Sequence, residues 1–259
     1  MNLGIEGRTA IVCASSRGLG RACAEALAQE GVNVVMNGRN AEALEAAAAE
    51  LRRTARGKVC SIAADITTTE GQAKLLAVCP VADILVNNNA GPDPGKFEQI
   101  DREKWLAAVE ANMVAPLMMI RALLPGMKER RFGRVVNITS AMVTAPRPHM
   151  MLSAGARAGL TAALKGLSIE VARSNVTINN LLPERFDTDR QEQMARVAME
   201  RDNISYEEAR ARQVESIAAR RLGDPRELGA ACAFLCSVWA GYISGQNVHL
   251  DGGSYPGLI

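Results

Sequence analysis

Aromatic and histidine side chains are scarce in this chain of 259 residues, which has only two Trp, three Tyr, four Phe and two His. Its six cysteines form no CxxC pair and no regular framework, so neither a zinc site nor a disulfide scaffold is expected. No apolar stretch is expected to span a membrane, and no basic-then-apolar leader opens the chain. We therefore expect a cytoplasmic protein with reduced thiols and no bound metal.

Neither sign of charge is in excess, because thirty Lys and Arg balance twenty-eight Asp and Glu to leave a net charge of +2. Such a balance gives no general affinity for nucleic acid or for anionic membranes, so neither is predicted as a partner. Apolar material is abundant instead, since 48% of the residues are hydrophobic. That is enough for one large α/β domain or for two small domains.

Short β-branched runs alternate with longer alanine-rich segments along the chain. Strands are predicted over 9–14, 32–37, 58–65, 83–88, 133–140, 176–182 and 247–253. Helices are predicted over 18–30, 42–53, 69–79, 101–130, 153–173 and 225–238. Continuous apolar strands that alternate with helices are typical of a parallel sheet covered on both faces. We predict a single doubly wound α/β domain over 1–259, a Rossmann fold of about seven strands.

Residues 184–221 interrupt this alternation with a polar, charged and helical segment that contains no predicted strand. Its position predicts an excursion over the carboxyl edge of the sheet, where folds of this kind bind ligands. A lid over a substrate and a solvated helical insertion both fit this pattern.

The stretch "CASSRGLG" (13–20) lies between the first predicted strand and the first predicted helix. Small residues there let backbone amides approach a pyrophosphate, and the helix N-terminus adds positive potential. After the second strand, residues 37–40 read Asn-Gly-Arg-Asn and offer no acid to the ribose of NAD. Arg39 and Arg17 could pair with a 2′-phosphate, which favours NADP. The alternative is that both are solvated surface arginines. Asp65 is placed either to contact an adenine or to cap the next helix.

Several motifs in the correct order resemble the short-chain dehydrogenase/reductase family over nearly the whole chain. Residues 13–20 stand in the place of its Thr-Gly-x-x-x-Gly-x-Gly loop, with Cys and Ala for the first Thr and Gly. "LVNNNAGP" (85–92) is similar to its Asn-Asn-Ala-Gly turn, with the register open by one residue. Residues 179–188 are similar to its Pro-Gly cofactor segment, and 222–253 to its C-terminal signature.

This resemblance implies an NADP(H) site and a homo-oligomer, either a dimer or a tetramer, to which the small-residue helix 153–173 contributes. The cofactor-binding residues that it implies are Ala14, Ser15, Ser16, Arg17, Gly18, Leu19, Gly20, Arg39, Asp65, Ile66, Asn87, Asn89, Ala90, Arg157, Pro183 and Thr188. The catalytic positions that it implies are Asn112, Ser140, Ser153 and Arg157.

The family keeps a catalytic Tyr about thirteen residues after its Ser, and a Lys four residues after that Tyr. Counting from Ser140 puts Ser153 and Arg157 in these two positions, which predicts an atypical active site. An aliphatic hydroxyl is a far weaker acid than a phenol, and a guanidinium does not release its proton. His149 is an alternative proton donor, although a solvated loop histidine is the plainer interpretation. Other polar residues beside the cofactor segment are Glu184, Arg185 and Asp187.

The segments "GPDPG" (91–95) and "LLPERFDTDR" (181–190) resemble a 3-oxoacyl-reductase-like branch that carries a small residue and an Arg in this slot. The resemblance predicts an NADP(H)-dependent oxidoreductase acting on a carbonyl or hydroxyl group of a small molecule. Two alternatives stay open. One is an NADP(H)-binding protein with little or no dehydrogenase activity, such as a sensor or an inactive partner subunit. The other is a lyase or isomerase that uses Arg157 to bind an anionic substrate.

Overall fold

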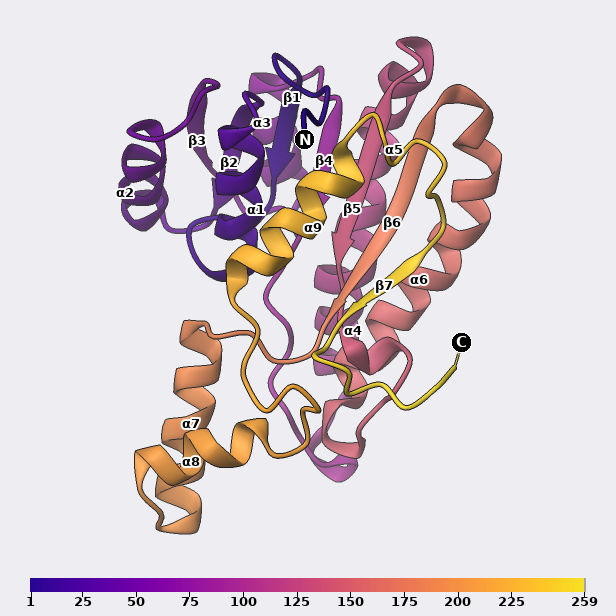
Figure 1. The fold of residues 1–259 in the computed structure, drawn as a ribbon. Helices are drawn as coiled ribbons and strands as arrows, with labels where there is room; N and C mark the ends of the chain where they lie inside the picture. The colour runs from indigo at the N-terminus through magenta and orange to yellow at the C-terminus, as the bar shows by residue number, and fades with distance from the viewer. Residues whose placement is uncertain (259) are drawn as a thin grey trace.

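Seven parallel strands form one sheet in the computed structural model, which describes residues 1–258 (Figure 1). They are β1 Thr9–Val12, β2 Asn33–Gly38, β3 Val59–Ala63, β4 Ile84–Asn87, β5 Gly133–Ile138, β6 Val176–Pro183 and β7 Asn247–Leu250. Their spatial order is β3-β2-β1-β4-β5-β6-β7. The order reverses between β1 and β4, and ligands of such sheets bind outside the strand ends at this point. The predicted doubly wound α/β sheet is confirmed.

The described residues contain nine α-helices. They are α1 Gly18–Gln29, α2 Ala41–Arg52, α3 Thr69–Val78, α4 Arg102–Val109, α5 Ala115–Glu129, α6 Met151–Val171, α7 Asp189–Asp202, α8 Tyr206–Val214 and α9 Pro225–Cys236. Side chains of α1, α2 and α9 share one apolar core with the sheet, and those of α3, α5 and α6 share another. Both faces of the sheet are therefore covered, which explains the apolar runs within its central strands.

Polar caps mark where several helices begin. The side chains of Asn40, Thr68 and Asp101 accept hydrogen bonds from the first turns of α2, α3 and α4. At α9 a capping box joins Asp224 and Glu227. Each cap satisfies backbone amides that have no partner inside the helix, so these residues set the helix starts.

The helix predicted over 101–130 is interrupted by a π-helical turn, Glu110–Val114, between α4 and α5. Taken together, Arg102–Glu129 is long and apolar enough to cross a membrane by length and composition alone. This corrects the expectation that no segment reaches that length. The apolar composition has a source within the fold, because Met119, Ile120 and Leu123 lie in the core beneath the sheet.

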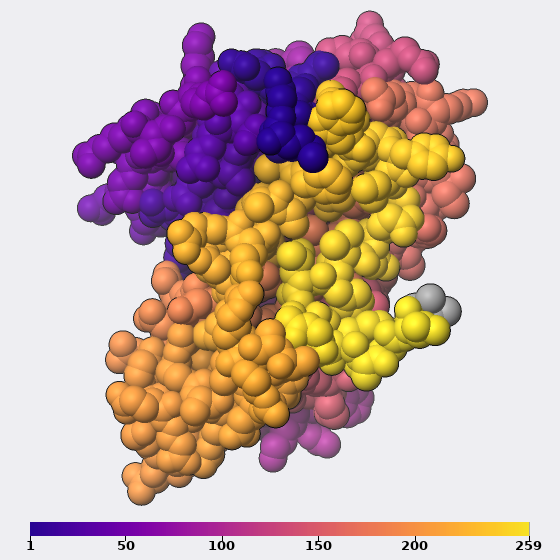
Figure 2. Space-filling view, viewed as in Figure 1, coloured from indigo at the N-terminus to yellow at the C-terminus, as the bar shows by residue number. Residues whose placement is uncertain are grey.

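Residues 184–221 contain α7 and α8 and no strand of the sheet, as expected. The two helices project beyond the edge at which the strands end (Figure 1) and form a lobe there (Figure 2). All six cysteines are free. Residues 1–258 contain no group of three or more His, Cys, Asp or Glu side chains suited to a metal ion.

Candidate active site

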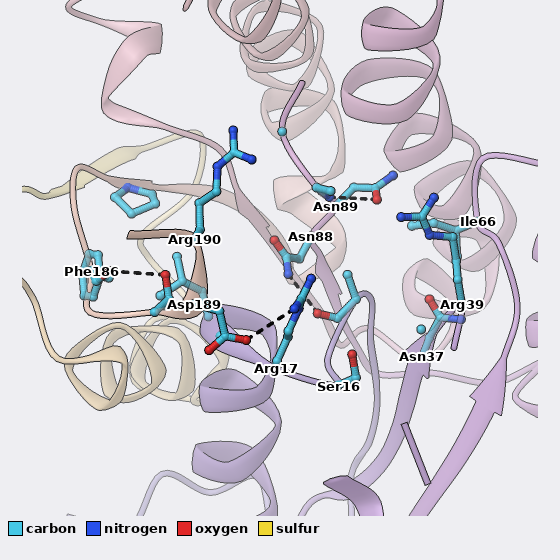
Figure 3. Close-up of a pocket in the computed structure, with 18 of the residues that line it drawn as sticks. Ser16, Arg17, Asn37, Arg39, Ile66, Asn88, Asn89, Phe186, Asp189 and Arg190 are labelled. Atoms are coloured by element: carbon cyan, nitrogen blue, oxygen red, sulfur yellow. Dashed lines mark hydrogen bonds and ion pairs between the residues drawn. The ribbon is translucent and has the colours of Figure 1, made fainter. Parts of the chain in front are cut away.

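A cleft of about 640 Å³ opens at the carboxyl edge of the sheet (Figure 3). Its walls are the loop after β1, the ends of β2 to β4, and the segment that leads from β6 into α7. Predicted cofactor residues that line it are Ala14, Ser16, Arg17, Gly18, Leu19, Arg39, Asp65, Ile66, Asn89, Ala90, Pro183 and Thr188. The structure thus gathers residues from five separate segments at the switch point of the sheet.

Buried polar contacts support the loop between β1 and α1. Ser15 is fully buried and donates from its hydroxyl to the Val12 carbonyl at 2.8 Å, so it supports the loop and does not line the cleft. Gly20 is also buried, and a Cβ there would lie 2.4 Å from the Ala14 carbonyl oxygen. This close approach requires a glycine at position 20, because any side chain would push the loop off the helix.

Ala14 adopts a left-handed backbone conformation with φ of 45°. The family resemblance puts a glycine in this position, and an L-residue is strained there by about 1–2 kcal/mol. We expect Ala14→Gly to raise the free energy of unfolding by about 1 kcal/mol in a urea titration. Ala163→Gly on the exposed side of α6 is the matched control and should lower it by a similar amount. A loss of stability in both variants would contradict the strain at Ala14.

Arg17 and Arg39 both line the cleft (Figure 3). Arg39 is exposed at the end of β2, next to the buried Asn37, whose amide donates to the carbonyls of Ile62 and Ala64. Asn37 was not among the predicted site residues, and its place at the end of a predicted strand was the available signal. No carboxylate occupies residues 37–40, so the end of β2 offers positive charge alone.

Asp65 follows β3 and is tied into its own turn, because its side chain accepts from the Thr67 amide at 3.0 Å and from the Thr67 hydroxyl at 2.8 Å. Burial raises the pKa of this carboxyl, but these bonds and the charge of Arg39 outweigh burial and lower it overall. The carboxylate is therefore ionised at neutral pH and accepts hydrogen bonds on the cleft wall.

Three consecutive asparagines follow or end β4, and they point in different directions. Asn88 lines the cleft and donates from Nδ2 to the Ala14 carbonyl at 3.2 Å, which joins it to the phosphate loop. Asn89 also lines the cleft, and its Nδ2 donates to the Ala111 carbonyl. Asn87, which sequence analysis assigned to the cofactor, is instead buried within the sheet. The register of the asparagine turn is therefore Asn88-Asn89-Ala90-Gly91.

Asn112 lies in the π-helical turn between α4 and α5 and is 4% exposed. Its Nδ2 lies 3.5 Å from the Ala90 carbonyl and 3.4 Å from the Ala108 carbonyl. Inserted π-turns are rare and are frequently found at functional sites. This one places Asn112 against the turn that follows β4.

Ser140, Ser153 and Arg157 are not among the residues that line the cleft. Ser140 follows β5 and its hydroxyl accepts from the Met142 amide at 3.1 Å. Ser153 is 4% exposed in the first turn of α6. Arg157 Nη1 donates to the carbonyls of Ile138 at 2.7 Å and Thr139 at 2.9 Å. Burial lowers the pKa of Arg157 to about 10, which leaves it charged at neutral pH.

The other polar residues that sequence analysis considered as proton donors occupy different surroundings. The side chain of His149 is exposed, as the plainer interpretation holds, and its carbonyl accepts from Gly95. Glu184 lines the cleft with 4% of its side chain exposed, and its carboxylate lies 2.6 Å from Arg147 and 3.6 Å from Arg185. These two guanidinium groups hold the Glu184 carboxylate in place at the cleft wall.

Two ion pairs connect the start of α7 to the phosphate loop and to the loop after β4. Asp189 lies 3.4 Å from Arg17 on the phosphate loop (Figure 3), and Arg190 lies 3.3 Å from Asp93 on the loop after β4. These α7 residues were not among the predicted site residues. An exposed ion pair contributes about 0–1 kcal/mol to stability, so these contacts hold α7 near the cleft only weakly.

The family profile described as enoyl-(acyl carrier protein) reductase matches residues 13–255. The chain belongs to this family, the short-chain dehydrogenases/reductases. A curated relative is the "NADPH-dependent reductase BacG" of Bacillus subtilis, 32% identical over 256 residues that cover 97% of this chain and 99% of the relative. Another is the 3-oxoacyl-[acyl-carrier-protein] reductase FabG of Vibrio harveyi, 30% identical with coverage of 98% and 99%.

Solved structures of the family extend this likeness to three dimensions. L-sorbose reductase from Gluconobacter frateurii, in complex with NADPH and L-sorbose, has a TM-score of 0.94 at 28% identity and full coverage of both chains. YwfH, an NADPH-dependent reductase of bacilysin biosynthesis, has a TM-score of 0.91 at 31% identity, with 98% of this chain and 100% of that chain covered. The cofactor predicted from the sequence agrees with the NADPH named for these relatives.

Proposed function

We propose that this chain is an NADPH-dependent reductase that transfers a hydride to the carbonyl group of a small molecule. The observation that carries the proposal is the cleft itself. It joins a tight phosphate loop at a helix N-terminus to a strand end that offers Arg39 and no acid. Relatives named as NADPH-dependent reductases support the same reading.

The residues of the cleft fit this cofactor. The loop of residues 14–19 would hold the diphosphate, Arg39 and Arg17 the 2′-phosphate, and Asp65 with Ile66 the adenine. A second cavity of about 550 Å³ adjoins the cleft and shares Ala90 and Gly91 with it. It offers room for a small-molecule substrate. Bound NADPH would supply the hydride, and the protein would supply orientation and charge.

The proposal includes an atypical active site, in which Ser153 and Arg157 take the places of the family's Tyr and Lys. Without a phenol, positioned proton transfer is weakened, and this step is typically worth about 10²–10⁴ in rate. The Ser140 hydroxyl would donate a hydrogen bond to the carbonyl oxygen, and Asn112 would hold the neighbouring turn. We therefore propose carbonyl groups already activated by an electron-withdrawing neighbour as the substrate class.

We further propose that residues 184–221 act as a lid over one dinucleotide-binding domain, and that the chain assembles as a cytoplasmic homo-oligomer. The lid is supported by the two ion pairs from α7 to the phosphate loop and to the loop after β4. The oligomer is supported by α6, in which Gly155, Gly166 and exposed alanines offer a thin surface for close helix packing.

A test combines melting temperature with turnover. We expect NADPH at about a hundredfold excess over its Kd to raise the melting temperature by roughly 5–10 °C, and NADH to raise it less. A panel of activated and simple ketones should then show NADPH loss with the activated members only. A rise without turnover across the panel would favour a binding protein without dehydrogenase activity. No rise with any nucleotide would exclude both functions.

A further inference from the structure

Four asparagines form a hydrogen-bonded row across the sheet, one on each of the strands β4 to β7. Asn87, Asn137, Asn180 and Asn247 pair in register from strand to strand. Each Nδ2 donates to the Oδ1 of the next, at 2.9, 3.1 and 2.8 Å. We call this row the asparagine ladder. All three bonds run in the same direction, so the amide dipoles align and the ladder begins with the carbonyl oxygen of Asn87.

That oxygen is one of three buried polar atoms whose side chains lie close together. Asn87 Oδ1, Asn112 Oδ1 and Arg157 Nε have no hydrogen-bond partner within residues 1–258, and each atom is shielded from solvent. The three side chains line the same small void, of about 10 Å³. They are 2%, 4% and 8% exposed, respectively. Buried polar groups in native proteins almost always find a partner, so three orphaned atoms around one void require an explanation.

We propose that this void is a binding site for a single water molecule. Its volume is close to the smallest that one water occupies. Two amide oxygens and one N–H match the two hydrogens and one lone pair of a water molecule. A cation would be repelled by the guanidinium group of Arg157, and an anion would be repelled by the two amide oxygens. The inference does not depend on the proposed reductase activity, because it rests on these three atoms alone.

The water connects the asparagine ladder to Arg157. The Nη atoms of this arginine are held by the backbone carbonyls of Ile138, Thr139 and Asn89. The water holds the remaining Nε–H, and Asn87 acts through it as a positioning residue for the guanidinium group. The acceptor end of the aligned amides, Asn87 Oδ1, is on the side of Arg157. This favours the charged form of the guanidinium group, which burial disfavours.

Nuclear magnetic resonance of the full chain tests the site directly. The Nε–H signal of Arg157 is assigned by its loss in Arg157→Lys. We expect this proton to show a cross-relaxation peak with a long-lived water in the wild type. Asn87→Leu should abolish the peak, because leucine is similar in size and offers no acceptor. Asn247→Leu breaks the far, exposed end of the same ladder and should keep the peak. A peak that persists in Asn87→Leu would overturn the proposal, as would its absence from the wild type.

A crystal structure of the wild-type chain gives a second test that does not depend on any variant folding. We expect one ordered water within about 2.7–3.2 Å of Asn87 Oδ1, Asn112 Oδ1 and Arg157 Nε. A dry void would overturn the proposal. So would a rotated Asn112 amide whose Nδ2 donates directly to Asn87 Oδ1, because the two groups would then satisfy each other.

Discussion

Replacing Ser153 by tyrosine and Arg157 by lysine is expected to raise the rate of NADPH oxidation with an activated ketone by about 10²-fold. The phenol supplies the general acid that the wild-type site lacks, and the ammonium group lowers the pKa of that phenol toward working pH. Steady-state NADPH loss at saturating cofactor measures the change.

The matched control is Ser153→Phe with Arg157→Lys, which adds the same ring without its hydroxyl. Both double variants place a ring at a position that is 4% exposed in the wild type, and both remove the contacts of Arg157 to Ile138 and Thr139. Any steric or stability cost is therefore shared. Equal rates in the tyrosine and phenylalanine variants would contradict our account of the missing acid.

The variant Arg39→Asp is expected to weaken NADPH binding by roughly 10–100-fold and to leave NADH binding unchanged or improved. A hydrogen bond to a charged group is worth about 1.5–3 kcal/mol, and 1.4 kcal/mol is tenfold in affinity. The new carboxylate would repel a 2′-phosphate but accept the ribose hydroxyls of NADH. Fluorescence titration with each nucleotide measures the two Kd values.

Arg53→Asp is the control for this experiment. Arg53 is exposed at the end of α2 and does not line the cleft, yet the substitution changes the net charge by the same amount. NADPH and NADH should bind this variant as they bind the wild type. If Arg39→Asp weakens both nucleotides equally, Arg39 does not contact a 2′-phosphate.

The strands and most helices could be predicted from the sequence, because the apolar runs and capping residues that specify each element lie within or next to it. The π-helical turn at Glu110–Val114 does not, since the residues on either side form helix by the same pattern. The register of the asparagine turn was ambiguous for a related reason. Asn87 and Asn88 are chemically identical, and only the alternation of a strand decides that Asn87 lies in the sheet while Asn88 reaches the loop.

The parts of the site that sequence did not reveal depend on long-range contacts. Asp189 and Arg190 join the cleft only because α7 folds back toward Arg17 and Asp93, which lie far away in the chain. Arg157 was predicted to touch the cofactor. Its guanidinium group instead donates to the carbonyls of Ile138 and Thr139 at the end of β5, inside the protein. Carbonyls at the end of a strand have no sequence signature, so this burial was not predictable.

The central claim is that the cleft carries out hydride transfer from NADPH without a tyrosine in the usual position. The most direct test supplies NADPH deuterated at the transferable C4 position together with an activated ketone, and analyses the alcohol by mass spectrometry. We expect one deuterium at the carbinol carbon of the product, even if turnover is slow. Tight binding of NADPH with no deuterium in any product would contradict the claim, and would leave the chain as a cofactor-binding protein.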